Sequence, residues 1–169
     1  MLSENLDSLN KNSLNRYLRP CESSDEMALR EVYEDAIRTC DKSLYSQDQI
    51  EAWASLAYLP GILDKPLKQG MGWVSCIDKT IEAFALKYPH DRLALLYCRG
   101  RSSRQGHATA LLNQIEEDTL KDRPITLKTE ASLYSYQLLL RHGWTIIAPE
   151  EIQIGGVHFS RYLMEKTLY

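Results

Sequence analysis

The 169-residue sequence predicts a mixed α/β fold, with a mostly antiparallel sheet of about seven strands and one central parallel βαβ crossover. Two observations favour it. Residues 93–98 are almost continuously apolar, as in a central strand that is buried on both faces. A helical pattern over 106–120 and a short strand-like run over 125–130 follow. That order is typical of a strand–helix–strand crossover.

The N-terminal part is predicted to contain a short strand and two helices. Residues 14–19 have the pattern of a strand. Ser23 and Glu26 have the spacing of a capping box, followed by apolar residues at helical spacing. Ser46 and Gln49 repeat this signal for a second helix.

The remaining elements are strands joined by tight turns, together with one more helix. Residues 61–71 have the composition of a loop. Turn residues and alternation then predict a hairpin of 73–77 and 81–88, a helix over 132–142 that Gly143 closes, and a last strand pair at 144–148 and 157–164.

Composition bounds the class of protein. We expect a flexible N-terminus over 1–13 and a single domain over 14–169, since this length suits one sizeable core. The sequence is 44% hydrophobic and 25% charged, which argues against disorder. The formal net charge of −3 gives no support to a nucleic-acid partner, which usually leaves a basic footprint.

Targeting and metal-binding signals are missing from the sequence. The four cysteines form no CxxC pair, so we expect no metal site. The polar N-terminus resembles no secretory signal, and no apolar run approaches about 18 residues, so we expect no membrane partner. The expected location is the cytoplasm.

An anion site is predicted where the central strand gives way to a helix. Backbone N–H groups at a helix start have no intrahelical acceptors, and the helix dipole adds positive potential. Gly106 would let a pyrophosphate approach the backbone, while Arg104 adds charge and Ala108 keeps the next turn open.

This stretch resembles the acetyl-CoA motif of the GNAT N-acetyltransferase superfamily, whose pattern is Gln/Arg-x-x-Gly-x-Gly/Ala after a strand. Here it reads Ser103-Arg104-Gln105-Gly106-His107-Ala108, with a serine at the first position. The resemblance implies acetyl-CoA as cosubstrate and a three-layer fold with helices on both faces of the sheet. It also implies these cofactor-binding residues: Tyr97, Cys98, Ser103, Arg104, Gln105, Gly106, His107, Ala108 and Thr109.

Other segments resemble the same superfamily. The segment "ASLYSYQLLLRHGW" is similar to its helix before a Gly-Phe turn, and "GGVHFSRYLMEKTL" to its closing strand. The segment "YSQDQIEAWAS" is similar to the Tyr-Ser-x-x-Gln-x-x-Ala-Trp segment of one bacterial subgroup, where it lines the acceptor side. Tyr45 and Trp53 are therefore candidates for the acceptor pocket, although Trp53 at helical spacing also fits the core.

Two residues are candidates for proton transfer. Glu130 ends the strand after the phosphate helix and would take a proton from the attacking amine; alternatively it only complements the next helix dipole. Many relatives place a tyrosine acid where this chain has Leu139. Tyr136, one helical turn earlier, would replace it or serve as a core aromatic. Cys98 could be acylated or be a small buried hydrophobe.

The sequence thus predicts an acyl-CoA-dependent N-acyltransferase that moves an acetyl group to an amine by direct attack. The alternative is a non-catalytic acyl-CoA-binding or regulatory domain of the same fold, which the missing tyrosine at Leu139 keeps open. The acceptor stays unassigned among a protein N-terminus, lysine, polyamine, aminoglycoside and amino acid. The sequence also leaves open whether the protein forms a homodimer.

Overall fold

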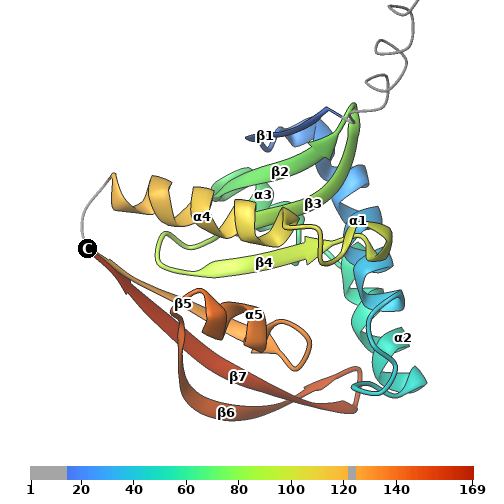
Figure 1. The fold of residues 1–169 in the computed structure, drawn as a ribbon. Coiled ribbons are helices and arrows are strands. Elements are labelled where there is room, and N and C mark those ends of the chain that lie inside the picture. The colour runs from blue at the N-terminus through green and yellow to red at the C-terminus, as the bar shows by residue number, and fades with distance from the viewer. Residues whose placement is uncertain (1–14, 122–124) are drawn as a thin grey trace, which may run out of the picture.

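A computed structural model describes residues 15–121 and 125–169. The expected flexible N-terminus over 1–13, and Leu14 of the first predicted strand, lie outside these residues. The described residues form two antiparallel sheets (Figure 1). In chain positions, the strands are β1 (Arg16–Pro20), β2 (Met71–Ile77), β3 (Thr80–Lys87), β4 (Leu93–Cys98), β5 (Ile125–Ser132), β6 (Thr145–Ile154) and β7 (Val157–Leu168).

The first sheet has the order β1-β2-β3-β4 and the second the order β5-β7-β6. Five α-helices accompany them in the described part of the chain, with short 3-10 turns at Ser23–Asp25 (η1), Leu56–Tyr58 (η2) and Gly100–Ser102 (η3). The helices are α1 (Glu26–Arg38), α2 (Gln47–Ser55), α3 (Asp64–Gln69), α4 (His107–Leu120) and α5 (Tyr136–Arg141).

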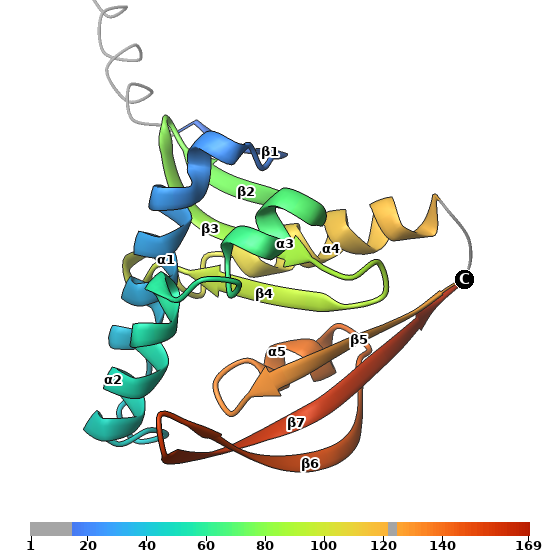
Figure 2. The same cartoon turned by 180° about the vertical axis from the view of Figure 1, so that it is seen from behind.

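Helices cover both faces of the first sheet, as the resemblance implied (Figures 1 and 2). Alternation along β3 produces this arrangement, because successive side chains of a strand point to opposite faces. Phe84 and Leu86 belong to the core cluster that contains α1. Ala83 and Ala85 belong to the cluster that contains α4, where small side chains let that helix approach the strand.

The expected single sheet with a central parallel crossover is not what the described residues form. β4 and β5 share one parallel bridge, Arg92 with Lys128, and no ladder. The Thr129 hydroxyl also donates to the Leu93 carbonyl at 2.8 Å. Beyond this point the strands diverge (Figure 1). β4 is therefore only partly buried after Leu93, whereas the apolar run predicted burial on both faces.

Three local predictions need correction. Residues 64–69 form α3 rather than a loop. The Asp64 carboxylate accepts the Gly61 N–H at 2.6 Å at the start of this helix. Pro66 lies in the first turn, where a backbone N–H has no acceptor within the helix, so the missing N–H of proline is tolerated. The Ser23–Glu26 capping box is wrong. Instead, Asp25 accepts the Glu22 N–H at 2.8 Å and pairs with Arg19.

The predicted helix over 132–142 is shorter than expected. β5 continues to Ser132, and the Ser132 hydroxyl then accepts the Ser135 N–H at 3.1 Å. This local turn competes with helix formation, so α5 begins only at Tyr136. The Ser46–Gln49 capping box is confirmed, with N–H groups at 2.8 and 3.2 Å from the partner side chains.

Candidate functional site

A cavity of about 260 Å³ occupies the opening between β4 and β5. Its walls come from β4, from the start of α4, from the end of β5 and from the α5 region. Most of the residues predicted to hold the cofactor line it, namely Tyr97, Cys98, Ser103, Arg104, Gly106, His107, Ala108 and Thr109. The structure thus brings a strand edge and a helix N-terminus to one cavity.

The start of α4 has the features of an anion site. Ala110 donates the first backbone bond into the helix, to the Gly106 carbonyl at 3.0 Å. The N–H groups of residues 106–109 have no backbone acceptor within the described ranges. Arg104 is exposed and forms no ion pair with any described residue. Free amides, the helix dipole and this guanidinium together suit a phosphate group.

Gly106 has a conformational role in addition to the predicted one. Its φ is +86°, in the left-handed region that disfavours residues with a Cβ. Among the described residues, a Cβ built there would meet only the Arg16 guanidinium, at 3.7 Å. The glycine therefore sets the direction of the loop, and room for a phosphate stays a prediction.

Arg16 is a contact that sequence reasoning missed. Its Nη1 donates to the Gln105 carbonyl at 2.6 Å, across 89 positions of sequence. No sequence signal connects β1 with this loop. The Gln105 side chain donates to the Arg101 carbonyl at 3.1 Å and does not line the cavity, so its predicted cofactor contact has no support in the geometry.

His107 lies at the helix start with its side chain buried, 1% exposed. Its Nδ1 is 2.7 Å from the Ser75 hydroxyl on β2, and its Nε2 has no hydrogen-bond partner within the described residues. Burial lowers the pKa of His107, with a further contribution from Arg16. The imidazole therefore stays neutral and fixes α4 on β2, while the backbone of His107 remains at the anion site.

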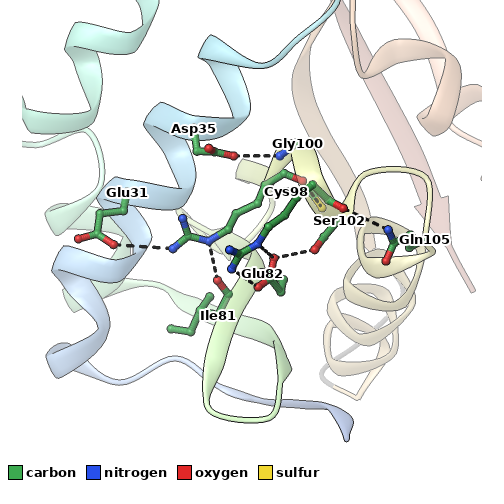
Figure 3. A network of polar contacts seen from close by, with 10 residues as sticks. Glu31, Asp35, Ile81, Glu82, Cys98, Gly100, Ser102 and Gln105 are labelled. Atoms are coloured by element: carbon green, nitrogen blue, oxygen red, sulfur yellow. Dashed lines mark hydrogen bonds and ion pairs between the residues drawn. The ribbon is translucent and has the colours of Figure 1, made fainter. Parts of the chain in front are cut away.

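A polar network holds the turn that precedes the loop at the start of α4 (Figure 3). The buried Glu82 carboxylate accepts the Ser102 hydroxyl at 2.6 Å and pairs with Arg101 at 2.5 Å. Asp35 of α1 accepts the Gly100 N–H at 2.9 Å. Burial raises the pKa of Glu82, but the bonds from Arg101 and Ser102 outweigh it and leave the pKa lowered. Sequence reasoning missed Glu82, since one carboxylate in an alternating strand carries no signal.

Cys98 ends β4 beside the cavity. Burial raises the pKa of its thiol to about 11, so the thiol is protonated at neutral pH and is a poor nucleophile. The Arg99 N–H donates to the Glu82 carbonyl at 2.8 Å. N–H directions alternate along a strand, so the Cys98 N–H points away from β3, toward the gap beside β5.

A second cavity of about 420 Å³ adjoins the first. The candidates for the acceptor pocket both line it, and their rings lie 5.2 Å apart. The Tyr45 hydroxyl accepts the Leu133 N–H at 2.9 Å, and the Trp53 Nε1 donates to the Tyr97 hydroxyl at 3.3 Å. Residues shared by both cavities are Trp53, Ala94, Leu95, Tyr97, Glu130 and Ser132.

The two catalytic candidates occupy different surroundings. Glu130 lines both cavities, and its carboxylate is paired with the Arg92 Nε at 2.9 Å. Tyr136 lines neither cavity; its ring packs against Tyr162 with centroids 4.8 Å apart. Of the tyrosines near α5, Tyr134 lines the first cavity, and sequence reasoning did not consider it. This geometry favours a core role for Tyr136.

Comparison with known proteins was informative at the level of structure alone. No protein-family model and no curated protein matches the sequence. A GCN5-related N-acetyltransferase from Rhodopseudomonas palustris superposes with a TM-score of 0.85 at 20% identity, over 93% of this chain and 99% of that chain. The chain has the fold of the GCN5-related N-acetyltransferases.

Two further structures of this fold are similar. The PaiA N-acetyltransferase of Thermoplasma acidophilum, solved in complex with coenzyme A, matches with a TM-score of 0.71 at 17% identity, over 91% of this chain and 99% of that one. The ribosomal-protein-S18-alanine N-acetyltransferase of Escherichia coli matches with a TM-score of 0.66 at 14% identity, over 91% and 94%. At these identities the likeness concerns the fold.

The described residues show neither a metal-ligand cluster nor a membrane-spanning helix. They contain no group of three or more His, Cys, Asp or Glu side chains placed to hold a metal ion. None of their helices combines the length and the apolar character needed to cross a membrane.

Proposed function

We propose that this protein is an N-acetyltransferase that moves an acetyl group from acetyl-CoA to an amine. The observation that carries the proposal is the opening between β4 and β5, with free backbone amides at the start of α4 on one side and a second cavity beyond. The coenzyme A in the similar PaiA structure supports it.

The residues present fit the proposed cosubstrate. The amides of residues 106–109 and the Arg104 guanidinium suit the pyrophosphate of acetyl-CoA. The diverging edge of β4 offers backbone groups to the extended pantetheine arm. The Cys98 N–H, directed toward the gap, would polarise the thioester carbonyl.

Glu130 is the proposed general base. It lies where the two cavities share their walls, between the expected positions of the thioester and the amine. Its carboxylate, held 2.9 Å from the Arg92 Nε, is the group that would accept the proton of the amine. The amine nitrogen then attacks the carbonyl carbon, the C–S bond breaks, and the CoA thiolate leaves and takes up a proton.

Calorimetry with CoA and acetyl-CoA tests the binding step, and release of free thiol in the presence of an amine panel tests the transfer step. We expect one site per chain and amine-dependent thiol release. Absence of binding would refute the proposal. Binding without thiol release for any amine would favour the alternative, a non-catalytic acyl-CoA-binding domain.

A further inference from the structure

The charges of the second cavity narrow the class of acceptor. Three cationic side chains line it, Lys65, Arg92 and Arg161, against a single carboxylate, Glu130. Lys65 forms no ion pair with a described residue, and its Nζ lies 5.7 Å from the centre of the Tyr88 ring. A polycation would add like charge to this cavity, which disfavours polyamines and aminoglycosides.

The two arginines keep their Nη groups available for a ligand. Arg92 pairs with Glu130 through Nε, and Arg161 pairs with Glu150 through Nε at 2.5 Å. Within the described residues neither arginine has an acceptor for its Nη groups. A guanidinium binds a carboxylate through such paired N–H groups, so both can take an additional anion.

Strand register places one arginine beside the proposed base. Arg161 of β7 lies opposite Ser132 of β5, and Ser132 is two residues from Glu130. Side chains at paired positions, and at positions two apart, share a face of the sheet. Glu130, Ser132 and Arg161 therefore point to the same side, and all three line the second cavity.

The rest of that cavity is largely apolar and aromatic. Phe159 and Ile152 pair across β6 and β7, and Phe159 is only 5% exposed. The Phe159 ring lies 6.2 Å from that of Tyr45 and 6.3 Å from that of Trp53. These rings would stabilise a large apolar group rather than a charged chain.

We propose that the acceptor is a free α-amino acid with a large apolar side chain. An α-amino acid carries an amine and a carboxylate on one carbon, which complements the adjacent Glu130 and Arg92. The amine would face Glu130, the carboxylate the arginine Nη groups, and the side chain the ring cluster. This inference rests on the proposed function.

The reaction balances with these groups alone. The amino group enters as an ammonium ion, and Glu130 takes one of its protons. An N–C bond then forms to the acetyl carbon, the C–S bond of the thioester breaks, and the second proton of the nitrogen passes to the thiolate. Glu130 returns its proton to solvent. CoA leaves as a thiolate and is protonated, and the product is an N-acetyl amino acid. Acetylation removes the positive charge of the amine, which weakens the product's attraction to Glu130 and favours its release.

The test compares L-phenylalanine with L-phenylalaninamide, phenethylamine and spermidine as acceptors, measured by thiol release from acetyl-CoA. We expect kcat/KM for phenylalanine to exceed that for each of the others at least about tenfold, because the carboxylate contacts are charge-assisted. The amine of the amide loses its proton more readily, so intrinsic reactivity works against this result. Equal or better use of the amide, phenethylamine or spermidine would overturn the inference.

Calorimetric binding of phenylalanine to the CoA-saturated protein separates the two proposals. Binding without turnover would refute transfer and support the amino-acid site. Turnover of peptide N-termini with no binding of free phenylalanine would support transfer and refute the amino-acid site.

Arg161 supplies the matched variants. Arg161→Gln should raise KM for phenylalanine at least about tenfold with kcat within about twofold, and Arg161→Lys should recover part of the affinity. The control is Arg38→Gln, which removes another ion-paired arginine, from α1, that lines neither cavity. A KM for phenylalanine that is unchanged in folded Arg161→Gln would also overturn the inference.

Discussion

Gly106 shows how one backbone angle controls the proposed cosubstrate site. At φ of +86°, a β-branched residue is strongly disfavoured, so Gly106→Val should redirect the loop and weaken CoA binding at least about tenfold. Calorimetry measures this. Gly156→Val is the control, because Gly156 has φ of +81° in the turn between β6 and β7, with open space around it. Equal CoA affinity in folded Gly106→Val would mean that the phosphates bind elsewhere.

Glu130 is the residue on which the proposed proton transfer depends. Glu130→Gln removes the base while keeping a similar shape, so kcat should fall about 10²–10⁴-fold with CoA affinity nearly unchanged. Steady-state kinetics with a working acceptor measures the change. Glu117→Gln, on the exposed face of α4, serves as the control. If Glu130→Gln keeps the kcat of the parent chain, the attacking amine loses its proton to solvent and Glu130 is not the base.

Tyr136 packs away from both cavities, so its hydroxyl is not expected to act on the thiolate. We expect Tyr136→Phe to keep kcat within about twofold, since only a hydrogen bond from Gln137 is lost. The same assay applies. A tenfold loss of kcat with normal stability would restore the acid role, through an intervening water.

At the scale of elements, the turn before α4 is fixed by groups from β3 and α1 rather than by its own sequence. Glu82 is 3% exposed and holds Ser102 and Arg101. Glu82→Leu should lower the free energy of unfolding by about 1–3 kcal/mol, since it leaves the buried Ser102 hydroxyl without its acceptor.

The same substitution should raise the dissociation constant for CoA, because the loop loses its anchor. Denaturant titration and calorimetry check the two effects. Arg101→Gln, which keeps the Glu82 carboxylate and its bond from Ser102, should weaken CoA binding less than Glu82→Leu does. An undiminished CoA affinity in Glu82→Leu would show that the loop keeps its shape without the network.

At the scale of the whole molecule, His107 joins α4 to Ser75 of β2 in the first sheet. The buried His107 side chain should make the free energy of unfolding depend on pH. The folded pKa of His107 lies below its ordinary value of 6.5, so the unfolded chain binds a proton that the folded chain resists. The contribution of His107 to the free energy of unfolding is fully present above about pH 6.5. It is lost as the pH falls below that value, by at most about 1.4 kcal/mol per pH unit.

Denaturant titrations between about pH 7.5 and pH 5 measure this loss. At the higher pH, His107→Gln should be less stable than the parent chain. Its free energy of unfolding should not fall between the higher and the lower pH as that of the parent chain does. The exposed His90→Gln should behave as the parent chain does. An identical pH dependence in His107→Gln would assign the fall to other groups.

Local patterns were enough for most elements and for part of the site. The β4 and α4 predictions agree with the structure, and so does the capping box at Ser46, because periodicity and capping act over a few residues. Predictions failed where another contact competed with the expected one. Arg19 reaches Asp25 from outside the motif and moves the first cap, and the local Ser132–Ser135 turn shortens α5.

By itself, then, the sequence determined the order of the strands and of every α-helix of the described residues except α3. It also determined the strand–loop–helix at the proposed cosubstrate site and the resemblance to the GNAT superfamily. Tertiary structure alone decided that β4 and β5 part after Arg92 and Lys128, and that Glu130 and Arg161 face one cavity. It also decided that Arg16 and Glu82 hold the segment before α4 and that Tyr136 lines neither cavity. The physical reason is the sequence separation over which each kind of interaction acts. Periodicity and caps express forces between near neighbours in sequence, whereas a cavity and its charges arise from residues that only the packed chain brings together.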